Sequence, residues 1–463
     1  MDELLKVVSS VNSYLSDYVL VFLLVVTGVY FSIRTRFVQV RCFAEGWKRT
    51  FGNFTLRGGK NGGGLSSFQA LSTAVAAQVG TGNIVGASGA ILAGGPGAIF
   101  WMWIIAFFGM ATIYAEAVLA QITRVVDADN TIHGGPVYYI KRAFPNLFGK
   151  FLAVFFAVAI TVSLGFMGCM VQANSIGETC ANAFNIPAWL VGIFIALIAF
   201  FIFIGGVSRL ASVTEKLVPT MAIVYILGGL LVVIARIEYL PQTFAVIFKY
   251  AFQPDALIGG SFGYALKTAV SQGAKRGLFS NEAGMGSTPH AHAAANVAKP
   301  HDQGVVAMIG LFIDTAVVLN MTAFIVISTI YTGDGPLAHA NGSNYAELLA
   351  SANLTKTNVV QYAVGSVSNG NLGNIFVAVC LLFFAFSTIL SWNYFGKINF
   401  QYLFGRRAVI VYSILGVACV FFGTLMKNDL VWELQDMFNQ LMVLPNVIAL
   451  LALASLVAAA ARR

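Results

Sequence analysis

The sequence predicts an all-α polytopic membrane protein in which two of the spanning helices are discontinuous. Of its 463 residues, 58% are hydrophobic and only 10% are charged, and the mean hydropathy is +0.79. Soluble domains carry roughly a quarter charged residues, so this composition excludes a globular enzyme with a large core. Long apolar runs recur along the chain, and polar residues and glycine interrupt two of them.

The apolar runs number eleven, and each is long enough to cross a bilayer as a helix. We expect a single transmembrane domain over 1–463, with an extra first span, five spans over 66–236 and five more over 257–461. Acidic residues precede the first run and arginines follow it, the reverse of a signal peptide, so this span is retained. The runs are 15–33, 66–93, 97–123, 151–180, 187–204, 214–236, 257–298, 304–331, 373–396, 406–426 and 432–461.

Positive charge is distributed unevenly between the connections. With the N-terminus outside, the cytoplasmic connections hold 19 of the 27 Lys and Arg residues, and the outside segments hold five. The positive-inside rule therefore predicts a plasma-membrane protein whose N-terminus is outside and whose C-terminus is cytoplasmic. This rule accounts for the net charge of +8 without a nucleic-acid partner. Segment 332–372 is then the long external loop, and we expect one or two short helices in it.

The second run contains a short polar, glycine-rich segment in its middle, where residues 78–83 read QVGTGN. Glycine costs a helix interior about 0.5–1 kcal/mol relative to alanine. Unwound backbone survives inside a bilayer only beside a cavity or buried in protein. We interpret the segment as a broken helix that holds a solute or an ion near mid-membrane. Close helix packing through Gly82 and Gly86 is the alternative.

The seventh run is too long and too polar for one simple helix, and we place its interruption at 271–277, which read SQGAKRG. Both interrupted runs carry Thr-Ala-Val ahead of the break, at 73–75 and 268–270. The second and seventh spans open two sets of five that cross the membrane in opposite directions. Paired interruptions at corresponding places are typical of transporters with inverted repeats.

Several other signals favour weaker interpretations. Segment 80–86 resembles a dinucleotide loop, but its third glycine falls one residue late and no soluble strand precedes it. His290 and His292 with Glu282 upstream suggest a metalloprotease, but the histidines face different sides of a helix and no HExxH is present. Five cysteines stand singly, which favours neither a disulfide framework nor a metal knuckle.

Two acidic residues, Glu116 and Asp314, lie inside predicted spans and are functional candidates for that reason. Either is a candidate proton site. Either is also a candidate for structural pairing with Lys275 or Arg276, and the sequence does not choose between these roles.

Four blocks of the sequence closely resemble the alanine/glycine:cation symporter family. They occur in order, and the similarity runs from about residue 60 to about residue 450. The resemblance implies the leucine-transporter fold, with five plus five inverted spans, and sodium-coupled uptake of alanine or glycine. The blocks are GGGLSSFQALSTAVAAQVGTGNIVG (62–86), GGPGAIFWMWIIAFFG (94–109), HGGPVYYIKRAF (133–144) and KRGLFSNEAGMGSTPHAHAAA (275–295).

The same resemblance implies the residues of a substrate site. Backbone amides of the first break would meet the substrate carboxylate, because a half-helix N-terminus presents free N–H groups and the positive end of its dipole. Side chains of the second break would face the ammonium group. For the aromatic member, Phe166, plain helix packing is the alternative. The implied residues are Gln78, Gly80, Thr81, Gly82, Asn83, Phe166, Ser271, Gln272 and Gly273.

For the coupling sodium ion, the resemblance implies the carbonyl oxygens of Ala76 and Val79 and the hydroxyls of Ser387 and Thr388 on the ninth span. Hard cations prefer oxygen ligands. The alternative for the two hydroxyls is a hydrogen bond back to a carbonyl of their own helix.

Two other function classes stay open: a proton-coupled transporter of another small solute on the same fold, and a passive channel, because glycine-rich breaks also form filters. The sequence contains no P-loop and no assembled nucleophile–base pair, so we expect neither ATP-driven transport nor enzyme activity. The expected partners are alanine or glycine, sodium and the lipid bilayer, with no cofactor and no obligatory protein partner.

Overall fold

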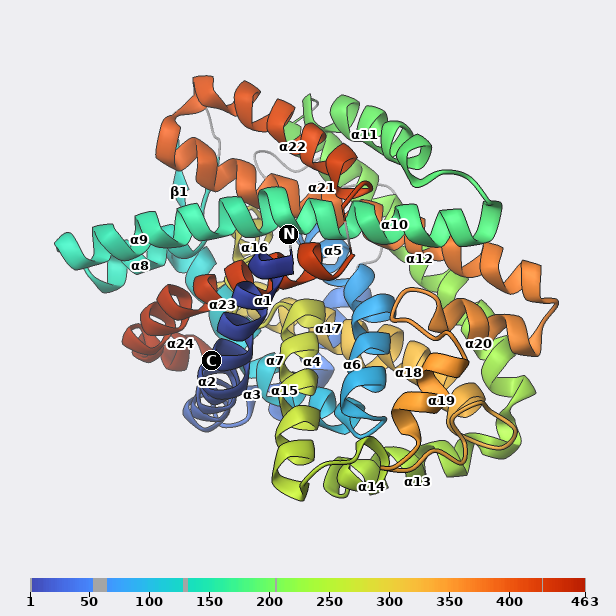
Figure 1. Ribbon diagram of the computed structural model, residues 1–463. Coiled ribbons are helices and arrows are strands. Elements are labelled where there is room, and N and C mark those ends of the chain that lie inside the picture. Colours follow the sequence, from blue (N-terminus) through green and yellow to red (C-terminus); the bar gives the residue numbers. More distant parts are fainter. Residues whose placement is uncertain (1, 53–64, 128–131, 205, 427, 463) are drawn as a thin grey trace.

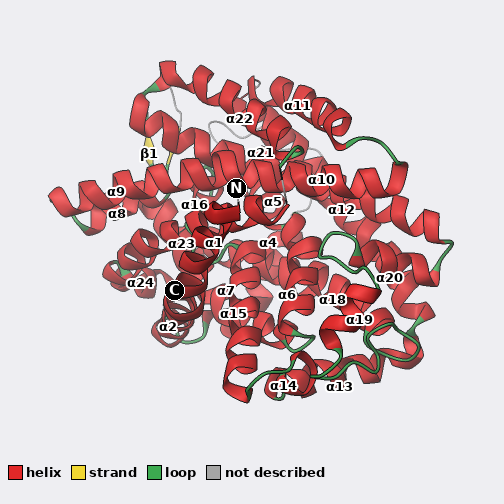
Figure 2. Ribbon diagram, viewed as in Figure 1, coloured by secondary structure: helices red, strands yellow, loops and turns green. Residues whose placement is uncertain are grey.

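A computed structural model describes residues 2–52, 65–127, 132–204, 206–426 and 428–462. The described chain is almost wholly helical (Figure 2). The exception is a short hairpin in which β1 (Val125–Val126) pairs antiparallel with β2 (Ile132–His133). Segments labelled η are short stretches of π- or 3₁₀-helix.

The chain begins with one long helix made of α1 (Asp2–Tyr14), η1 (Leu15–Leu20) and α2 (Val21–Arg34). Two short helices follow in the connection to the second span, α3 (Val38–Arg41) and α4 (Phe43–Phe51). The long N-terminal helix packs against α7, α15 and α23, which belong to both predicted sets of spans.

The first predicted set of spans begins at a well-capped helix. The Ser66 side chain accepts a hydrogen bond from the Gln69 backbone N–H, and the Gln69 side chain accepts one from the Ser66 N–H. The helices of this set are α5 (Ser67–Gln78), η2 (Gly82–Gly86), α6 (Ala87–Gly94), α7 (Ala98–Thr123), α8 (Pro136–Ala143), α9 (Leu147–Ile160), η3 (Thr161–Gly168), α10 (Cys169–Phe184), α11 (Ala188–Ile204) and α12 (Gly206–Ala235).

The connection to the second set and the long loop 332–372 both contain short helices, as predicted for the loop. They are η4 (Ile237–Tyr239), α13 (Leu240–Phe252), α14 (Asp255–Ile258), α19 (Tyr345–Ser351) and α20 (Val359–Val367). The helices of the second set are α15 (Phe262–Asn281), α16 (Pro289–Ala293), α17 (Pro300–Phe312), η5 (Ile313–Leu319), α18 (Asn320–Ile330), α21 (Gly370–Phe404), η6 (Arg406–Ala408), α22 (Val409–Gly423), α23 (Asn428–Ala452) and α24 (Ala454–Ala461).

Seven of the described helices are long and apolar enough to cross a membrane, and nine spans result when each of two bent pairs counts as one. The bent pairs are α5 with α6, at 44°, and α23 with α24, at 63°. The count does not include α11, which has 17 residues, or α15, which carries three basic side chains. The chain is therefore an integral membrane protein, and the count of eleven stays a prediction.

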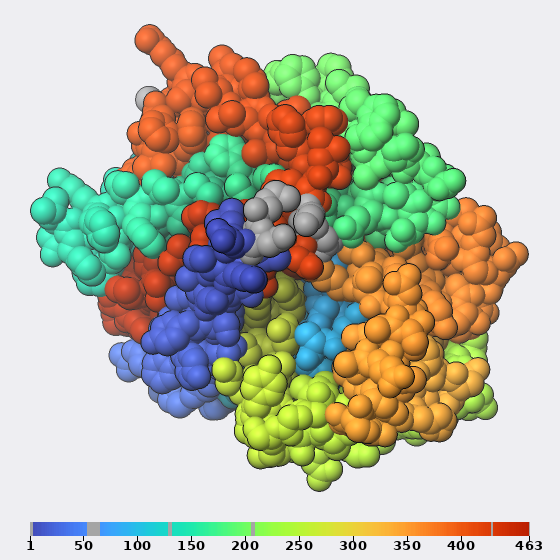
Figure 3. Space-filling model, viewed as in Figure 1, coloured from blue at the N-terminus to red at the C-terminus, as the bar shows by residue number. Residues whose placement is uncertain are grey.

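The predicted break in the second run is confirmed, because α5 ends at Gln78 and the helix resumes at Gly82. Both halves are buried at the centre of the bundle, where α6 lies between α15 and α18 (Figure 1). In the space-filling view, α6 is visible in a hollow between α15 and segment 332–372 (Figure 3). The break is therefore enclosed by protein on all sides, as unwound backbone in a bilayer requires.

The predicted interruption of the seventh run at 271–277 is wrong, because α15 continues through these residues to Asn281. Glycine serves helix packing here, since a Cβ on Gly273 would lie 2.8 Å from the Ala98 carbonyl oxygen of α7. The two charges are neutralised, since Lys275 and Arg276 both pair with an acidic residue of α23. Polar residues and glycine therefore do not require an unwound backbone at this position.

The seventh run breaks about ten residues later, at 282–288, between α15 and α16. Glu282, Gly284 and Gly286 have φ angles of +59°, +89° and +80°, a conformation that favours glycine and ends the helix. The start of the second run and the end of the seventh run are joined, because the Leu65 N–H donates to the Ala294 carbonyl at 3.0 Å.

Candidate functional site

The first break brings backbone very close to a side chain of the ninth predicted span. A Cβ on Gly80 would lie only 2.3 Å from the Thr388 hydroxyl oxygen, and one on Gly82 would lie 3.0 Å from the Ser280 Cα. Glycine is therefore required at these positions by contact with α21 and α15, in addition to its effect on the helix. The alternative of simple packing at Gly86 is less supported, since a Cβ there meets no atom closer than 3.8 Å.

Two backbone N–H groups of the break donate to side-chain amide oxygens. The Gly80 N–H donates to Asn83 Oδ1 at 3.0 Å, and the Thr81 N–H donates to Gln172 Oε1 at 3.1 Å. The Thr81 hydroxyl and Gln172 Nε2 are buried, and within the described residues neither has a hydrogen-bond partner. The break therefore offers N–H groups at a half-helix N-terminus and unused polar groups beside them, a suitable arrangement for a carboxylate.

Three carbonyl oxygens surround the hydroxyl group of Thr388. Its hydroxyl oxygen lies 2.8 Å from the Ala76 carbonyl oxygen, 3.1 Å from that of Phe384 and 3.4 Å from that of Val79. A hydroxyl has one proton to donate, so this buried group contains more acceptors than donors. Such a set of oxygens suits a hard cation. The structure thus brings together three of the four residues implied for sodium.

The fourth residue, Ser387, lies apart from that group of oxygens. Its hydroxyl donates to the Phe384 carbonyl of its own helix at 2.8 Å and lies 3.5 Å from the Met221 sulfur. This is the alternative that the sequence left open for both hydroxyls, and the Thr388 hydroxyl also bonds to the Phe384 carbonyl of its own helix, in addition to its contacts with the first break.

Asp314 connects the two broken runs. Its carboxylate accepts a hydrogen bond from Asn83 Nδ2 at 2.7 Å and one from the Ser280 hydroxyl at 2.9 Å. The side chain is fully buried in η5, and the basic residues Lys275 and Arg276 pair with Asp436. The structural pairing considered for Asp314 is therefore wrong, and its carboxylate is solvated by neutral donors.

Gln78 also connects the two runs, because its Nε2 donates to the Asn281 carbonyl at 2.7 Å. The residues of α15 that reach the first break are therefore those at its C-terminal end. Ser271, Gln272 and Gly273 lie elsewhere: Ser271 donates to Asp17 Oδ1 at 2.5 Å, and Gly273 packs against α7. The structure does not bring these three residues to the first break.

Gln272 packs beside Gly94 at the far end of α6, where a Cβ on that glycine would lie 3.2 Å from the Gln272 Cβ. Phe166 is half-buried in η3, and its ring centroid lies 5.3 Å from that of Tyr412 on α22. For Phe166 the structure therefore favours the alternative of helix packing.

The second break is held by two carboxylates. Glu116 is fully buried in α7 and accepts hydrogen bonds from the Gly284 N–H at 3.2 Å, the Gly286 N–H at 2.9 Å and Asn446 Nδ2 at 2.7 Å. Glu282 accepts from the Ser287 hydroxyl and the Trp392 indole N–H. The pairing of Glu116 with Lys275 or Arg276 is therefore wrong. The Glu116 carboxylate accepts hydrogen bonds from backbone N–H groups of this loop, and the two basic residues pair with Asp436.

Aromatic and charged groups cover the side of the first break that faces loop 332–372. The Phe279 ring lies 4.9 Å from that of Trp432 and 5.5 Å from that of Trp392. The Arg276 guanidinium lies 4.8 Å from the Trp432 ring and donates to both Asp436 oxygens, at 3.1 and 2.9 Å. This layer lies directly against the break, because a Cβ on Gly82 would be 3.0 Å from the Phe279 ring.

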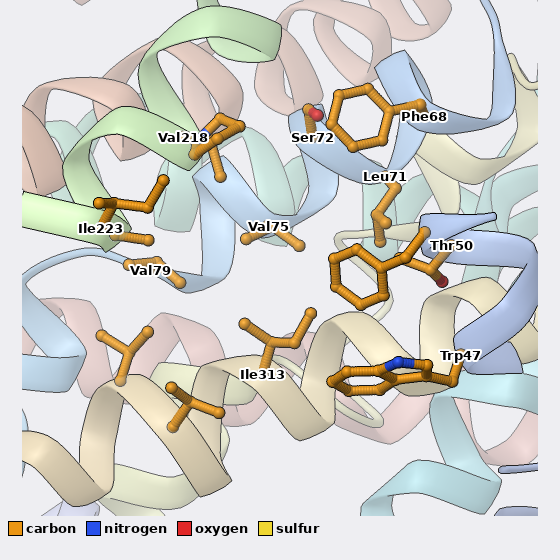
Figure 4. Close-up of a pocket in the computed structure, with 15 residues that line it drawn as sticks. Trp47, Thr50, Phe68, Leu71, Ser72, Val75, Val79, Val218, Ile223 and Ile313 are labelled. Atoms are coloured by element: carbon orange, nitrogen blue, oxygen red, sulfur yellow. The ribbon is translucent and has the colours of Figure 1, made fainter. Parts of the chain in front are cut away.

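A cavity of about 410 Å³ lies beside α5 and reaches Val79, the residue that follows this helix (Figure 4). Its lining is almost wholly apolar, so it offers a zwitterion no partner for either charge. The chemistry of a substrate site therefore lies in the break itself. The cavity is lined by Trp47, Thr50, Phe51, Phe68, Leu71, Ser72, Val75, Val79, Val218, Pro219, Ala222, Ile223, Ile313, Val317 and Val318.

Sequence reasoning missed Gln172, Ser280 and Asp436. Each is a polar residue within a predicted span, which is the signal that did identify Glu116 and Asp314. Their partners lie between 34 and 160 positions away in the chain, so the pairing itself has no local signal.

The profile of the sodium:alanine symporter family matches residues 1–463. A sodium/alanine symporter, AgcS, of Methanococcus maripaludis is 37% identical over 98% of this chain and 96% of its own length. In Bacillus subtilis, a putative sodium/proton-dependent alanine carrier is 40% identical over 96% of this chain and 90% of its own length. A probable sodium/glutamine symporter of the same organism is 38% identical over 99% of this chain and 90% of its own length.

Among solved structures, MhsT in complex with L-phenylalanine matches with a TM-score of 0.61. The match covers 87% of this chain and 96% of that chain, at 14% identity. The chain therefore shares the leucine-transporter fold of this neighbour, and the low identity says nothing further about its site.

Proposed function

The chain belongs to the sodium:alanine symporter family, and from this premise we propose that it couples the entry of sodium to the uptake of alanine or glycine. It is a transporter and not an enzyme. The observation that carries the proposal is the composition of the first break, where cation-binding oxygens and carboxylate-binding N–H groups belong to the same few residues.

The coupling follows from this composition. The carbonyls of Ala76 and Val79 bind the ion beside Thr388, and the next two N–H groups, of Gly80 and Thr81, bind the substrate carboxylate. Binding of either ligand orders the unwound segment that the other ligand needs, so each raises the affinity for the other. The Asn83 and Gln172 side chains accept hydrogen bonds from these N–H groups, and the substrate carboxylate replaces them as the acceptor.

Specificity for a small side chain is part of the proposal and is supported by the close packing around the first break. Residues 79–86 are buried, and Phe279 and Ser280 lie directly against Gly82, so little space remains there for a bulky substrate side chain. We expect glutamine, leucine and phenylalanine to compete with alanine progressively less well as their bulk increases.

The energy available is sufficient for scavenging. One sodium ion that moves with a zwitterion carries one net charge, worth about 2.3 kcal/mol per 100 mV. A tenfold sodium gradient adds about 1.4 kcal/mol, and together these support roughly 500-fold accumulation.

The same proposal includes the finer architecture. Adding α11 and α15 to the nine spans makes eleven, in two inverted sets of five after an extra N-terminal helix. The charge distribution supports an outside N-terminus and a cytoplasmic C-terminus. Impermeant thiol reagents should label Ser343→Cys in intact cells and leave Lys48→Cys unlabelled, since both positions are exposed in the structure. The reverse pattern would invert the orientation.

Uptake of labelled alanine into sealed vesicles tests the function. We expect an inward sodium gradient to drive transient accumulation, and an equal potassium gradient to drive none. Accumulation that is independent of sodium would contradict the proposal, and equilibration without accumulation would favour a channel.

Proton coupling through Asp314 is a second candidate, because its buried carboxylate has only neutral partners around it. An inward proton gradient without sodium would then drive alanine accumulation, and Asp314→Asn would abolish it. A proton gradient without effect removes this candidate.

A further inference from the structure

Three metal-ligating side chains converge where α4 meets the start of α17. The Cys42 thiol, a Glu45 carboxylate oxygen and a His301 ring nitrogen lie within 4.8 Å of one another, and no other group of this kind occurs in the described ranges. We propose that Cys42, Glu45 and His301 form a binding site for Zn²⁺ or a similar divalent transition-metal ion that fastens α4 to α17. Thiolate, imidazole and carboxylate are the three ligand types of zinc sites in proteins.

The ligand spacing is close to that of a tetrahedral site. Zinc–ligand bonds of about 2.0–2.3 Å place the ligand atoms of a tetrahedron roughly 3.3–3.7 Å apart. The distance of 3.4 Å from His301 Nε2 to Glu45 Oε2 already falls in this range. The remaining distances, at most 4.8 Å, need a contraction of about 1 Å, which side-chain rotation supplies.

His301 is oriented as metal-binding histidines are. Its Nδ1 lies 2.7 Å from the hydroxyl oxygen of Tyr114, a fully buried residue of α7, while its Nε2 points at Glu45. A hydrogen bond at the second ring nitrogen fixes the ring and raises its basicity toward a metal. With metal on Nε2, the Nδ1 proton is donated to the Tyr114 oxygen.

The burial of the three residues fits a three-ligand site with one open position. Cys42 and His301 are each 5% exposed, whereas Glu45 is half-buried at the surface of the short helix α4. Water can therefore reach the metal on the Glu45 side and occupy the fourth position. The loop that carries α4 is the one that the charge distribution assigns to the cytoplasm, where thiols stay reduced.

Binding changes one proton and one ion pair. Glu45 contacts Arg49 through one carboxylate oxygen and His301 through the other, so the oxygen on the His301 side already faces the site. Metal binding releases the Cys42 thiol proton to solvent as the sulfur–metal bond forms. Arg49 loses a partner at 2.9 Å but keeps Asp302 at 3.1 Å, a small cost for an exposed pair.

A metal here would fix one wall of the apolar cavity. Figure 4 shows Trp47 and Thr50 of α4 beside Leu71 of α5 and Ile313, the first residue of η5, which continues α17. The metal would thus join α17 to a helix that lines the cavity beside α5, and α5 leads into the first break.

Cobalt(II) is the probe of choice, because thiolate ligation gives it a charge-transfer band and four-coordination gives it intense d–d bands. Tag-free full-length protein in detergent should bind one equivalent with both features, and zinc should displace it. Cys42→Ser should lose the charge-transfer band, and Cys42→Ser and His301→Gln should each weaken zinc binding at least about tenfold. Tyr114→Phe should weaken it about 10–100-fold while the charge-transfer band persists.

Cys419→Ser is the matched control, since this cysteine lies half-buried on α22 away from the cluster, and it should behave as the parent protein. Thermal melting in the absence of metal identifies variants that fail to fold. If a variant fails, Glu45→Gln takes its place in the comparison of zinc affinities, because Glu45 is only half-buried. Absence of a charge-transfer band in the parent protein, or zinc affinity unchanged in Cys42→Ser or Glu45→Gln, overturns the proposal. Each readout is independent of alanine uptake.

Discussion

The two broken runs solve the same problem, an interrupted helix in a bilayer, by different means. In the first break the free N–H groups of Gly80 and Thr81 bond to neutral amide side chains. In the second, the N–H groups of Gly284 and Gly286 bond to the fully buried carboxylate of Glu116. Hydrogen bonds to a charged acceptor are roughly twice as strong as those between neutral groups. The first break is therefore easily rearranged by a ligand, whereas the second is held by the protein.

This difference assigns separate tasks to the two breaks. The first has unused polar atoms and an excess of oxygen acceptors, which are properties of a binding site. The second has left-handed backbone, and each described contact of its Glu116 carboxylate is with a donor; its one described side-chain oxygen without a partner is the Thr288 hydroxyl, at the end of the break. We infer that substitutions in the second break act on folding, and that those in the first act on ligands.

The largest effect is expected at Glu116. Glu116→Ala leaves three buried donors without their acceptor, at about 1–3 kcal/mol each, so we expect a loss of about 3–9 kcal/mol in the free energy of unfolding. Thermal denaturation of the purified protein measures it. Glu238→Ala, at an exposed position, should change stability by less than about 0.5 kcal/mol. A Glu116→Ala protein as stable as the parent would remove the distinction between the breaks.

The second-largest effect is expected for Gly80→Ala, which should weaken sodium binding. Its Cβ would lie 2.3 Å from the Thr388 oxygen, so the hydroxyl or the backbone must move. Overpacking costs about 3 kcal/mol at its upper range, equivalent to a roughly 150-fold weaker sodium site. Sodium titration of alanine uptake measures this.

Gly86→Ala is the matched control for that substitution, because its Cβ meets nothing closer than 3.8 Å. We expect a sodium dependence like that of the parent protein. Equal losses in both variants would mean that glycine matters here for helix flexibility and not for contact with Thr388.

The sequence predicts the position of the first break correctly and that of the second break wrongly, for a physical reason. The first break has a local signal, since glycine and amides interrupt an apolar run at 78–83. Residues 271–277 carry the same signal, yet the helix continues there because Asp436 neutralises Lys275 and Arg276. That partner lies 160 positions away, and no local pattern reports it.

The sodium residues show the same limit on a smaller scale. Ser387 and Thr388 are adjacent and chemically similar, and family resemblance treats them alike. A helix turns about 100° per residue, so only one of two neighbours can face the first break. Thr388 does so, because its hydroxyl reaches the Ala76 carbonyl in addition to the Phe384 carbonyl of its own helix. The Ser387 hydroxyl bonds to the Phe384 carbonyl and does not contact the first break. Which of two neighbours faces a site depends on the rotation of the whole helix, and that is a property of tertiary packing.

These two hydroxyls give the third prediction. Thr388→Ala removes a ligand and should raise the sodium concentration for half-maximal uptake at least tenfold, since a contact to a charge is worth about 1.5–3 kcal/mol. Ser387→Ala should change it less than about threefold, because the hydroxyl that it removes bonds to its own helix. Vesicle uptake at varied sodium measures both, and a larger shift in Ser387→Ala would reverse the assignment.

The smallest effects are expected for two serines of α15, and they test which end of this helix meets the substrate. Ser280 donates to Asp314 beside the first break, whereas Ser271 donates to Asp17 about two and a half turns away. Ser280→Ala removes a buried hydrogen bond worth about 1 kcal/mol and should raise the alanine concentration for half-maximal uptake about fivefold at saturating sodium.

Ser271→Ala should leave that concentration within about twofold, because its partner belongs to the N-terminal helix. Concentration dependence of initial uptake rates decides between them. A stronger effect of Ser271→Ala than of Ser280→Ala would place the ammonium group near 271–273, as the family resemblance implies. The contacts of α15 with the first break would then describe only one state of the transport cycle.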